Sequence, residues 1–221
     1  MPIPAQSILQ VVARDIGDEA CIRWTTGDLV AYFNDGQRDI VTHRPDARNV
    51  AANLSLVAGA KQTLPTGGEK LIDVLHNNTA NSKRAITKTD RKLLDAQVRG
   101  WRGLTGSAEI QHFMYDEREP KAFEVYPPAA VGAIVAIEYV AMPTDIVTPA
   151  PGSTTAAITG NMSLPDLFAN ALRNYVFFRC YSKNTEFSAS PNLAVAFYQA
   201  YANDIGIEAK GTASVSPNAQ A

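Results

Sequence analysis

The fold of this chain is constrained most by the order of its hydrophobic patterns. Amphipathic helix patterns lie on both sides of a block of short alternating strand patterns. Apolar residues recur at helical spacing from Ser7 to about Asp15, and a clearer pattern runs from Thr26 to Arg44. Two more helix patterns come late in the chain, from Leu164 to Lys183 and from Pro191 to about Ile205. We therefore expect an α+β protein: a bundle of about four or five helices with an inserted block of short antiparallel strands and hairpins.

Local signals indicate where the first two helices begin and end. Ser7 and Thr26 are hydroxyl residues of the kind that cap helix N-termini. Pro45 stops the second helix, because the residue before a proline is disfavoured in the helical conformation. Gly36 lies within the apolar stripe of that helix, where glycine is costly. It therefore predicts the close approach of another backbone.

The apolar period changes from helical to alternating after Pro45. Leu54–Ala58 is expected to form a strand that pairs with Leu71–His76, with turn residues between them. Ile110–Tyr115 and Ala122–Tyr126 are expected to form a hairpin around a charged turn. Pro127 and Pro128 should close the second strand of that hairpin.

Two further elements complete the β-rich region. Ala133–Val140 is an apolar run typical of a strand, and it ends before Pro143. A short helix is expected to start at Thr89-Asp90, with three residues on its buried side: Leu93, Leu94 and Val98.

These patterns divide the chain into four parts. We expect a helical bundle built from residues 1–50 and 163–206, and an inserted β-rich region over 51–146 with a short helix near 89–99. Residues 147–162 are expected to form an exposed loop with a brief extended tip at 156–158, since they are rich in Thr, Ala, Pro and Gly. Residues 207–221 have the composition of a C-terminal tail without a fixed structure of its own.

Composition excludes several classes of protein. A chain of 221 residues that is 46% hydrophobic can bury a sizeable core. Its net charge of −2 provides no global basic field for nonspecific nucleic-acid binding. No apolar run approaches the length of a membrane span, so no membrane association is expected.

The chemically reactive residues form no recognisable motif. His43, His76 and His112 lack metal-ligand spacing, so no metal site is predicted. Cys21 and Cys180 lie far apart beside apolar or aromatic neighbours and are expected to be buried, reduced thiols. We predict no catalytic residue, no cofactor and no enzymatic activity.

One segment concentrates positive charge. Its basic residues are candidates for facing a DNA lumen or a protein partner: Lys83, Arg84, Lys88, Arg91 and Lys92. The alternative is that these side chains form an ordinary solvated face, as isolated charge runs usually do. In a functional role, they would position a partner without reading base sequence.

Several segments in one order resemble the head-to-tail adaptor, or connector, proteins of tailed bacteriophages. The resemblance covers most of the chain and rests on five segments: Thr26–Ala47, Leu54–Pro65, Phe123–Pro128, Ile137–Pro143 and Leu164–Lys183. The loop near 148–161 is longer and more polar than the family minimum, and the tail after Lys210 belongs to a region that varies among such proteins.

This resemblance implies a structural virion protein without catalysis. Such adaptors commonly form a ring of about twelve subunits beneath the portal, which closed symmetry permits, and link it to a tail or nozzle protein. DNA would pass through the lumen without sequence-specific binding. The resemblance places the protein in the phage neck, assembled in the host cytoplasm. The tail is expected to order on the portal, with five candidate interface residues: Ile205, Gly206, Ile207, Lys210 and Val215.

Two other classes of function remain open at this point. The protein could be another structural part of a phage, such as a tail completion or capsid decoration protein. It could also be a virion-associated cell-wall hydrolase, whose acid would be Glu109, Asp116 or Glu124.

Overall fold

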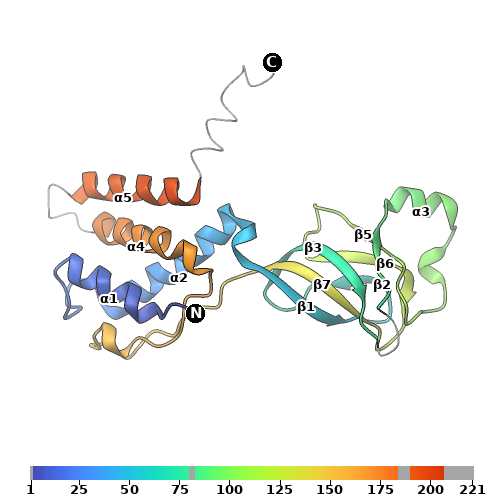
Figure 1. Cartoon of the computed structure of the whole chain (residues 1–221), viewed down its shortest axis with the longest axis horizontal. Helices are drawn as coiled ribbons and strands as arrows, with labels where there is room; N and C mark the ends of the chain where they lie inside the picture. The colour runs from blue at the N-terminus through green and yellow to red at the C-terminus, as the bar shows by residue number, and fades with distance from the viewer. Residues whose placement is uncertain (1, 80–82, 184–189, 207–221) are drawn as a thin grey trace, which may run out of the picture. The chain divides into compact units, whose positions relative to one another are not determined.

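The computed structural model describes residues 2–79, 83–183 and 190–206. The chain divides into two compact units: a helical unit made of Met1–Arg48 and Pro143–Ala221, and a β unit made of Asn49–Met142 (Figure 1). The described residues contain five α-helices and two sheets of mainly antiparallel strands. The α+β fold class predicted from the sequence is therefore confirmed.

Four helices build the helical unit: α1 (Ala5–Asp15), α2 (Thr26–His43), α4 (Ala169–Lys183) and α5 (Ser190–Ile205). Helix α4 packs against α1, α2 and α5, so it lies at the centre of the unit. The core of the unit contains side chains that are fully shielded from solvent, among them Leu9, Leu29, Phe33, Ile40, Leu172 and Val176. Burial of these apolar surfaces drives the association of helices that would be marginal alone.

The N-caps of helices α1 and α2 differ from those that the sequence predicted. Helix α1 starts at Ala5, directly after the extended Pro4, and Ser7 donates a hydrogen bond to the Pro4 carbonyl instead of capping. Thr25, not Thr26, caps α2, because Thr25 and Asp28 exchange hydrogen bonds in a capping box. Helix α2 ends at His43, two residues before Pro45, as predicted.

Gly36 marks a close contact, but its neighbours are side chains and not a backbone. A Cβ atom added at Gly36 would lie 2.7 Å from Leu172 Cδ1 and 2.8 Å from Tyr175 Cδ1, both on α4. The missing side chain of Gly36 therefore makes room for two large side chains of the facing helix.

A 3₁₀ turn over Asp166–Phe168 precedes α4, which therefore starts later than the predicted Leu164. The aromatic face of α4 packs on α5, as expected for core packing. Tyr175 meets Tyr201 edge-on at 5.2 Å between ring centroids, and Phe177 stacks on Phe197 at 4.7 Å. These pairs hold the last two helices together.

The β unit contains two sheets. The first has the order β1-β7-β3, made of β1 (Asn49–Ser55), β7 (Ile134–Ala141) and β3 (Gly68–Asn77). The second has the order β2-β6-β5-β4, made of β2 (Gly59–Thr63), β6 (Ala122–Ala129), β5 (His112–Tyr115) and β4 (Thr87–Lys88). One core joins the sheets, with buried side chains from both: Leu71, Val74, Phe113, Phe123, Val125, Val135 and Ile137.

The predicted pairing of Leu54–Ala58 with Leu71–His76 was wrong. Strands β1 and β3 each pair antiparallel with β7, which lies between them. The apolar run of β7 takes the central position because a central strand has its neighbours on both edges and gains most from burial. Strand β1 also ends at Ser55, so Leu56–Ala58 belongs to the turn before β2.

The β5–β6 hairpin is confirmed, with His112 opposite Tyr126 and Tyr115 opposite Phe123. Pro127 and Pro128 do not close β6, which continues to Ala129. They lie beyond the end of β5 and opposite the irregular register between Gly59 and Lys61 of β2. Proline is tolerated at such a bulge because no ladder hydrogen bond needs its missing N–H.

The short helix α3 (Arg91–Gln97) forms where expected, and Asp90 caps it through the Lys92 N–H. Leu94 is buried and Val98 packs on the same cluster, but Leu93 is 53% exposed and not on the buried side. A helix of this length has room for few inward positions, and Trp101 fills the space beside Leu94.

Most residues of the segment over 147–162 are exposed, but the segment also contacts the helical unit. It forms a 3₁₀ turn at Thr155–Ala157 that packs against α1, in place of the extended tip at 156–158. Thr155, Ile158 and Met162 are buried. The apolar residues spaced along this otherwise polar segment therefore contribute to the core of the helical unit.

Candidate interaction sites

The potential catalytic and metal-binding side chains lie apart. Among residues 2–79, 83–183 and 190–206, no group of three or more His, Cys, Asp or Glu side chains could hold a metal ion. His43 contacts the Asp39 carbonyl on α2, whereas His112 contacts Thr87 and stacks on Tyr126 in the β unit. His76 lies in β3 opposite Ala136, so the three histidines belong to three different elements.

Both cysteines are free and buried, as predicted. Burial raises the pKa of the Cys180 thiol to about 12, and the Cys180 carbonyl accepts a hydrogen bond from Trp24 Nε1. Burial likewise raises the pKa of Cys21. Since the thiolate is the nucleophilic form, these shifts fit packing roles.

The five basic candidates are spread along the segment that leads through β4 into α3. Lys83 donates to Asn78, and Arg84 pairs with Glu109 at 3.5 Å. Lys88 lies over the ring of Tyr115, with Nζ 5.9 Å from the centroid. Arg91 and Lys92 form the first turn of α3. The five side chains thus have different surroundings and do not form one patch.

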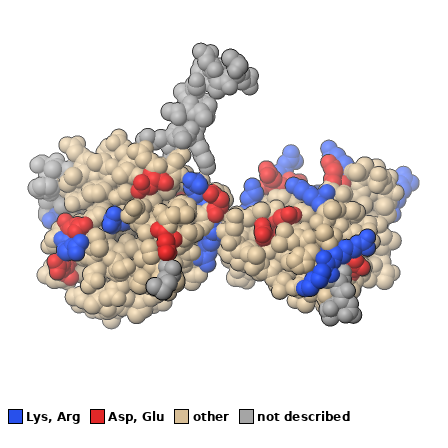
Figure 2. Space-filling model, viewed as in Figure 1, with Lys and Arg blue, Asp and Glu red and all other residues tan. Residues whose placement is uncertain are grey.

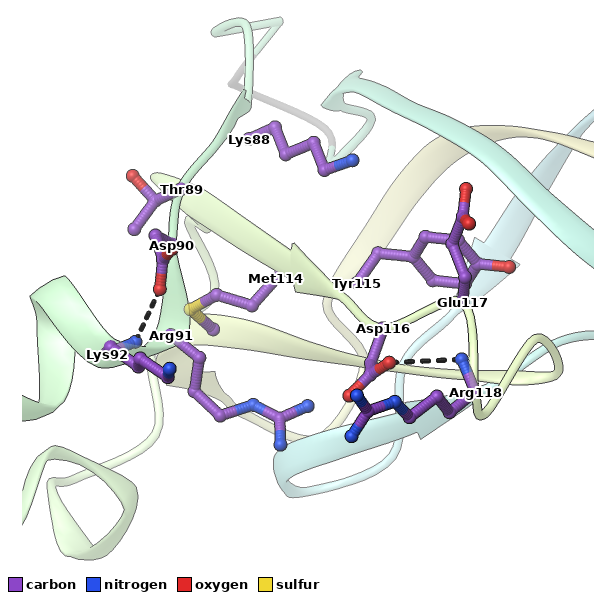
Figure 3. Close-up of a pocket in the computed structure, with 10 residues that line it drawn as sticks. All are labelled: Lys88, Thr89, Asp90, Arg91, Lys92, Met114, Tyr115, Asp116, Glu117 and Arg118. Carbon is purple, nitrogen blue, oxygen red and sulfur yellow. Dashed lines mark hydrogen bonds between the residues drawn. The ribbon is translucent and has the colours of Figure 1, made fainter.

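Three of these residues, Lys88, Arg91 and Lys92, line an open hollow of about 710 Å³. Figure 3 shows Arg91 reaching from the start of α3 toward Asp116 and Arg118 in the turn after β5. Arg118 is the fourth basic residue of the lining. Three acidic residues also line the hollow, and three uncharged residues complete it: Asp90, Asp116 and Glu117, with Thr89, Met114 and Tyr115. This near balance of charge favours a protein partner over a phosphate backbone.

Glu124 fixes Arg91 and also Arg102 in a network of ion pairs. Arg102 approaches the carboxylate with two nitrogens, at 2.9 and 3.0 Å, and Arg91 lies at 3.0 Å from it. The Glu124 side chain is only 16% exposed. Guanidinium groups contact both oxygens of this carboxylate, so Glu124 is the centre of an ion-pair network.

Asp95 extends this network to the buried Trp101. It accepts hydrogen bonds from Trp101 Nε1 at 2.8 Å and Arg102 Nη1 at 2.7 Å, and these bonds lower the pKa of Asp95. The Arg102 guanidinium also lies over the Trp101 ring at 4.3 Å. The network thereby ties α3 to β6 and gives Arg91 a structural contact in addition to its place in the lining of the hollow.

Arg44 fixes the end of α5, where the C-terminal segment begins. Its Nη1 donates to the Ile205 carbonyl at 3.3 Å, while Nε and Nη2 pair with Asp46 at 3.0 and 2.8 Å. Ile205 is buried, and Gly206 ends the helix with a φ of +72°. The other three candidate portal residues, Ile207, Lys210 and Val215, lie outside the described residues.

Further contacts hold α5 against the bundle. The Tyr201 hydroxyl donates to Asp39 on α2, and Asn174 Nδ2 on α4 donates to Asp204 at 2.9 Å. Tyr201 and Ile205 are both buried. The position from which the C-terminal segment leaves the helical unit is therefore fixed by α2 and α4 together.

Sequence reasoning missed Arg44, Arg102 and Arg118. Arg118 reaches the hollow because β4 pairs in parallel with β5, which brings Lys88 opposite Phe113. No periodic pattern signals a two-residue strand, so this juxtaposition had no sequence signal. From the sequence, Arg44 was expected only to mark the end of the second helix before Pro45.

The surface carries both signs of charge over each unit. In Figure 2, Lys and Arg side chains lie close to Asp and Glu side chains on the visible face of both units. Ion pairs between the two kinds include Lys61 with Glu119 at 2.9 Å and Lys121 with Glu69 at 2.8 Å. In the described part of the chain, no helix has the length and apolar character needed to span a membrane.

The described residues thus form a helical unit and a two-sheet unit with both signs of charge on their surfaces. The chain belongs to the SU10 adaptor protein family, whose model matches residues 3–221. This membership confirms the predicted resemblance to phage head-to-tail adaptors and implies association with portal and tail proteins in the virion neck. The family is one of structural adaptors and not a known class of enzyme. No curated protein matches the chain.

Proposed function

We propose that this protein forms a closed ring of about twelve copies, as cyclic symmetry allows, beneath the phage portal. The ring links the portal to the tail or nozzle protein, and DNA passes through its lumen. The protein has no catalytic step to perform and needs no cofactor in this role.

The observation that carries the proposal is the extent of the family match. Residues 3–221 include both units and the C-terminal segment, so the whole chain and not one shared unit has the adaptor pattern. A ring further requires two different surfaces that meet between neighbours. A chain with two compact units offers such surfaces without any change of fold.

The charge of the chain is compatible with a conduit for DNA. A net charge of −2 gives no strong overall attraction to the phosphate backbone, which would hinder passage. Lys83, Arg84, Lys88, Arg91 and Lys92 are proposed to face a partner and not to read base sequence. The mixed charge around Lys88 and Lys92 supports a protein as that partner.

The portal contact is proposed to begin at the end of α5. Ile205 and Gly206 would fix the root of the C-terminal segment, since Arg44 binds the Ile205 carbonyl at 3.3 Å. Ile207, Lys210 and Val215 would then contact the portal. Ordering of this segment on the portal would offset its conformational entropy by burial at the interface.

Native mass spectrometry of the purified protein, alone and with its purified portal, tests this function. The proposal predicts a complex of one portal ring with a complete ring of adaptor copies. Deletion of residues 211–221 should leave thermal unfolding unchanged and weaken attachment to the portal. A protein that stays monomeric and never joins the portal would refute the adaptor ring, whereas unchanged attachment of the truncated chain would refute only the role of the tail.

A further inference from the structure

Strand β1 has a partner strand on one of its two edges. It lies at the end of the sheet order β1-β7-β3, next to β7 (Figure 1). Its pairing with β7 is regular over all seven residues, from Asn49 opposite Val140 to Ser55 opposite Ile134. The outer edge of β1 therefore offers an unbroken row of backbone N–H and C=O groups, and such a row is a template for a further strand.

The outer backbone groups belong to the odd-numbered residues of β1: Asn49, Ala51, Asn53 and Ser55. Leu56 N–H continues the register and donates to the Ala133 carbonyl, so the even-numbered residues bond to β7. The Ile134 carbonyl, opposite Ser55, instead accepts from Asn78 N–H on the far side of β7. Within the described part of the chain, no hydrogen bond outside the pairing with β7 reaches the backbone of the four odd-numbered residues.

The sequence of β1 has none of the features that usually protect a free edge. Its seven residues include no charged residue and no proline, and its register has no bulge. The other edge strands are protected. Strand β3 has three register shifts and a bridge from His76 to Ala85. Strand β2 has a shift beside Lys61, and β4 consists of two residues. The contrast indicates that β1 is a site at which a strand is added.

The side chains of β1 alternate between two different faces. Val50, Ala52 and Leu54 are half-buried and pack on the core of the β unit. The odd-numbered side chains lie on the other face and are all exposed, small and uncharged. An added strand must therefore be apolar on the core side and small on the exposed side to continue both faces.

A second copy of β1 meets both requirements. When two copies pair antiparallel around a two-fold axis at Ala52, Val50 of each copy lies opposite Leu54 of the other and extends the apolar face. On the exposed face, Ala51 lies opposite Asn53, so residues with outer backbone groups meet one another. This two-fold register pairs all seven residues. It brings no like charges opposite each other, as self-pairing of a charged strand would.

Charged residues near the exposed face of β1 are compatible with this register. Glu138 of β7 lies opposite Ala51. On the same face, Lys83 donates to Asn78, whose Nδ2 donates to Asn53 Oδ1 at 2.7 Å. Because Ala51 of one copy lies opposite Asn53 of the other, the row that contains Glu138 of one copy continues toward Lys83 of the second. The two copies therefore bring opposite charges to this row.

We propose that the outer edge of β1 pairs with β1 of a second copy in this register and joins two free copies into a dimer. Their two three-stranded sheets become one continuous sheet. A two-fold contact closes on two copies, so it differs from the contacts that close the proposed ring and does not rest on that ring. An interface of one strand per copy is small, which makes the dimer reversible.

Disulfide trapping of the full-length protein, without the portal, tests the register. Ala52→Cys places a thiol opposite the same residue of the second copy, where the Cα atoms of a non-hydrogen-bonded pair lie about 4.5 Å apart and suit a disulfide. Ala51→Cys is the matched control, because its two copies lie diagonally, about 7–8 Å apart and beyond the usual disulfide range. The native Cys21 and Cys180 are both buried.

The proposal predicts that, with oxidised glutathione, Ala52→Cys forms a covalent dimer at least about tenfold faster than Ala51→Cys. Adding Ala51→Pro to Ala52→Cys should abolish the cross-link and keep thermal stability, because the Ala51 N–H points away from β7. Ala51→Lys, which adds a charge at the free edge, replaces the proline if that lowers stability.

Equal cross-linking of the two cysteine variants, or none in Ala52→Cys, would overturn the proposal. A cross-link that appears only after deletion of residues 207–221 would also overturn it and assign the edge to the C-terminal segment of the same chain. The outcome is separate from the adaptor function. Portal binding without a dimer would refute the dimer alone, whereas a dimer that never joins the portal would refute the adaptor function alone.

Discussion

Gly36 of α2 packs against Leu172 of α4, so closely that an added Cβ atom would lie 2.7 Å from Leu172 Cδ1. Leu172 is fully buried and cannot swing into solvent, and Tyr175 closes the other side at 2.8 Å. The short distance between α2 and α4 therefore depends on the missing side chain of Gly36.

Gly36→Ala should destabilise the protein despite the better helix propensity of alanine. Overpacking a filled core costs about 1–3 kcal/mol, which exceeds the gain of about 1 kcal/mol from replacing a helical glycine. Urea unfolding should show the loss as a lower midpoint. Gly27→Ala is the control, because its nearest contacts would be at 3.6 Å. Equal stability of Gly36→Ala and wild type would contradict the close contact.

Asp28 should make stability depend on pH. Burial alone would raise the pKa of Asp28, but hydrogen bonds from Lys183 and Thr25 outweigh it and lower the pKa below its ordinary value of 3.8. The folded protein therefore favours the carboxylate, so this stabilisation is complete at pH well above 3.8 and is lost as pH falls below it.

The variant Asp28→Asn isolates that contribution. It keeps the side-chain size but loses the charge, and at pH 7 we expect a loss of about 1 kcal/mol, as for other helix caps. Thermal unfolding of both proteins from pH 7 to pH 3 should show the difference shrinking toward low pH. A difference that stays constant over this range would exclude titration of Asp28 as its cause.

Tyr201→Phe tests how firmly α5 is held. The change removes the hydrogen bond from the hydroxyl to Asp39 but keeps the ring against Tyr175. Because water can reach Asp39, the expected loss is about 1 kcal/mol. Hydrogen exchange of α5 amides should accelerate as well. Tyr198→Phe, at an exposed ring on the same helix, should leave both measurements unchanged.

Glu124→Gln tests whether this carboxylate is an ion-pair centre or a hydrolase acid. Loss of the charge facing Arg91 and Arg102 should destabilise the β unit by about 1–3 kcal/mol, as for hydrogen bonds to charged groups. Glu109→Gln, at an exposed pair with Arg84, should cost under about 0.5 kcal/mol. Lytic activity on cell walls that disappears in Glu124→Gln without loss of stability would favour the hydrolase.

Periodicity predicted most of the helices and strands, because local apolar spacing decides whether a segment forms a helix or a strand, but it missed β2 (Gly59–Thr63), which lies where turn residues were expected. The β5–β6 hairpin, the β7 strand and the stop of α2 before Pro45 were all read from neighbouring residues. Helix starts were less certain. Thr25 and Thr26 are adjacent, and the sequence does not show which of them caps α2. The exchange of hydrogen bonds between Thr25 and Asp28 decides this in the structure.

Strand pairing could not be predicted from local apolar spacing. Leu54 and Leu71 lie in strands of one sheet, but β7, from much later in the chain, separates them. The pairing depends on which strand gains most from central burial, and this is a property of the whole unit. For the same reason, the sequence did not predict that Arg118 lies near Lys88 and Arg91. The two-residue parallel pairing of β4 with β5 brings these residues to one hollow.

The contact between the β1–β2 and β6–β7 turns also depends on long-range pairing. Val57 and Val131 lie more than 70 positions apart in the chain. The antiparallel pairing of β1 with β7, the bond from Leu56 to Ala133 and the pairing of Gly59 with Ala129 bring their turns together. The Gln62 carboxamide, which bonds to Val57 and Gly59, likewise has no signal in the sequence.

Cryo-electron microscopy can show whether copies of this chain close into a ring on the portal. Purified adaptor mixed with purified portal should give particles in which a complete adaptor ring is coaxial with the portal and surrounds an open channel. Particles that show the portal alone, with the adaptor remaining as single copies in solution, would contradict the account.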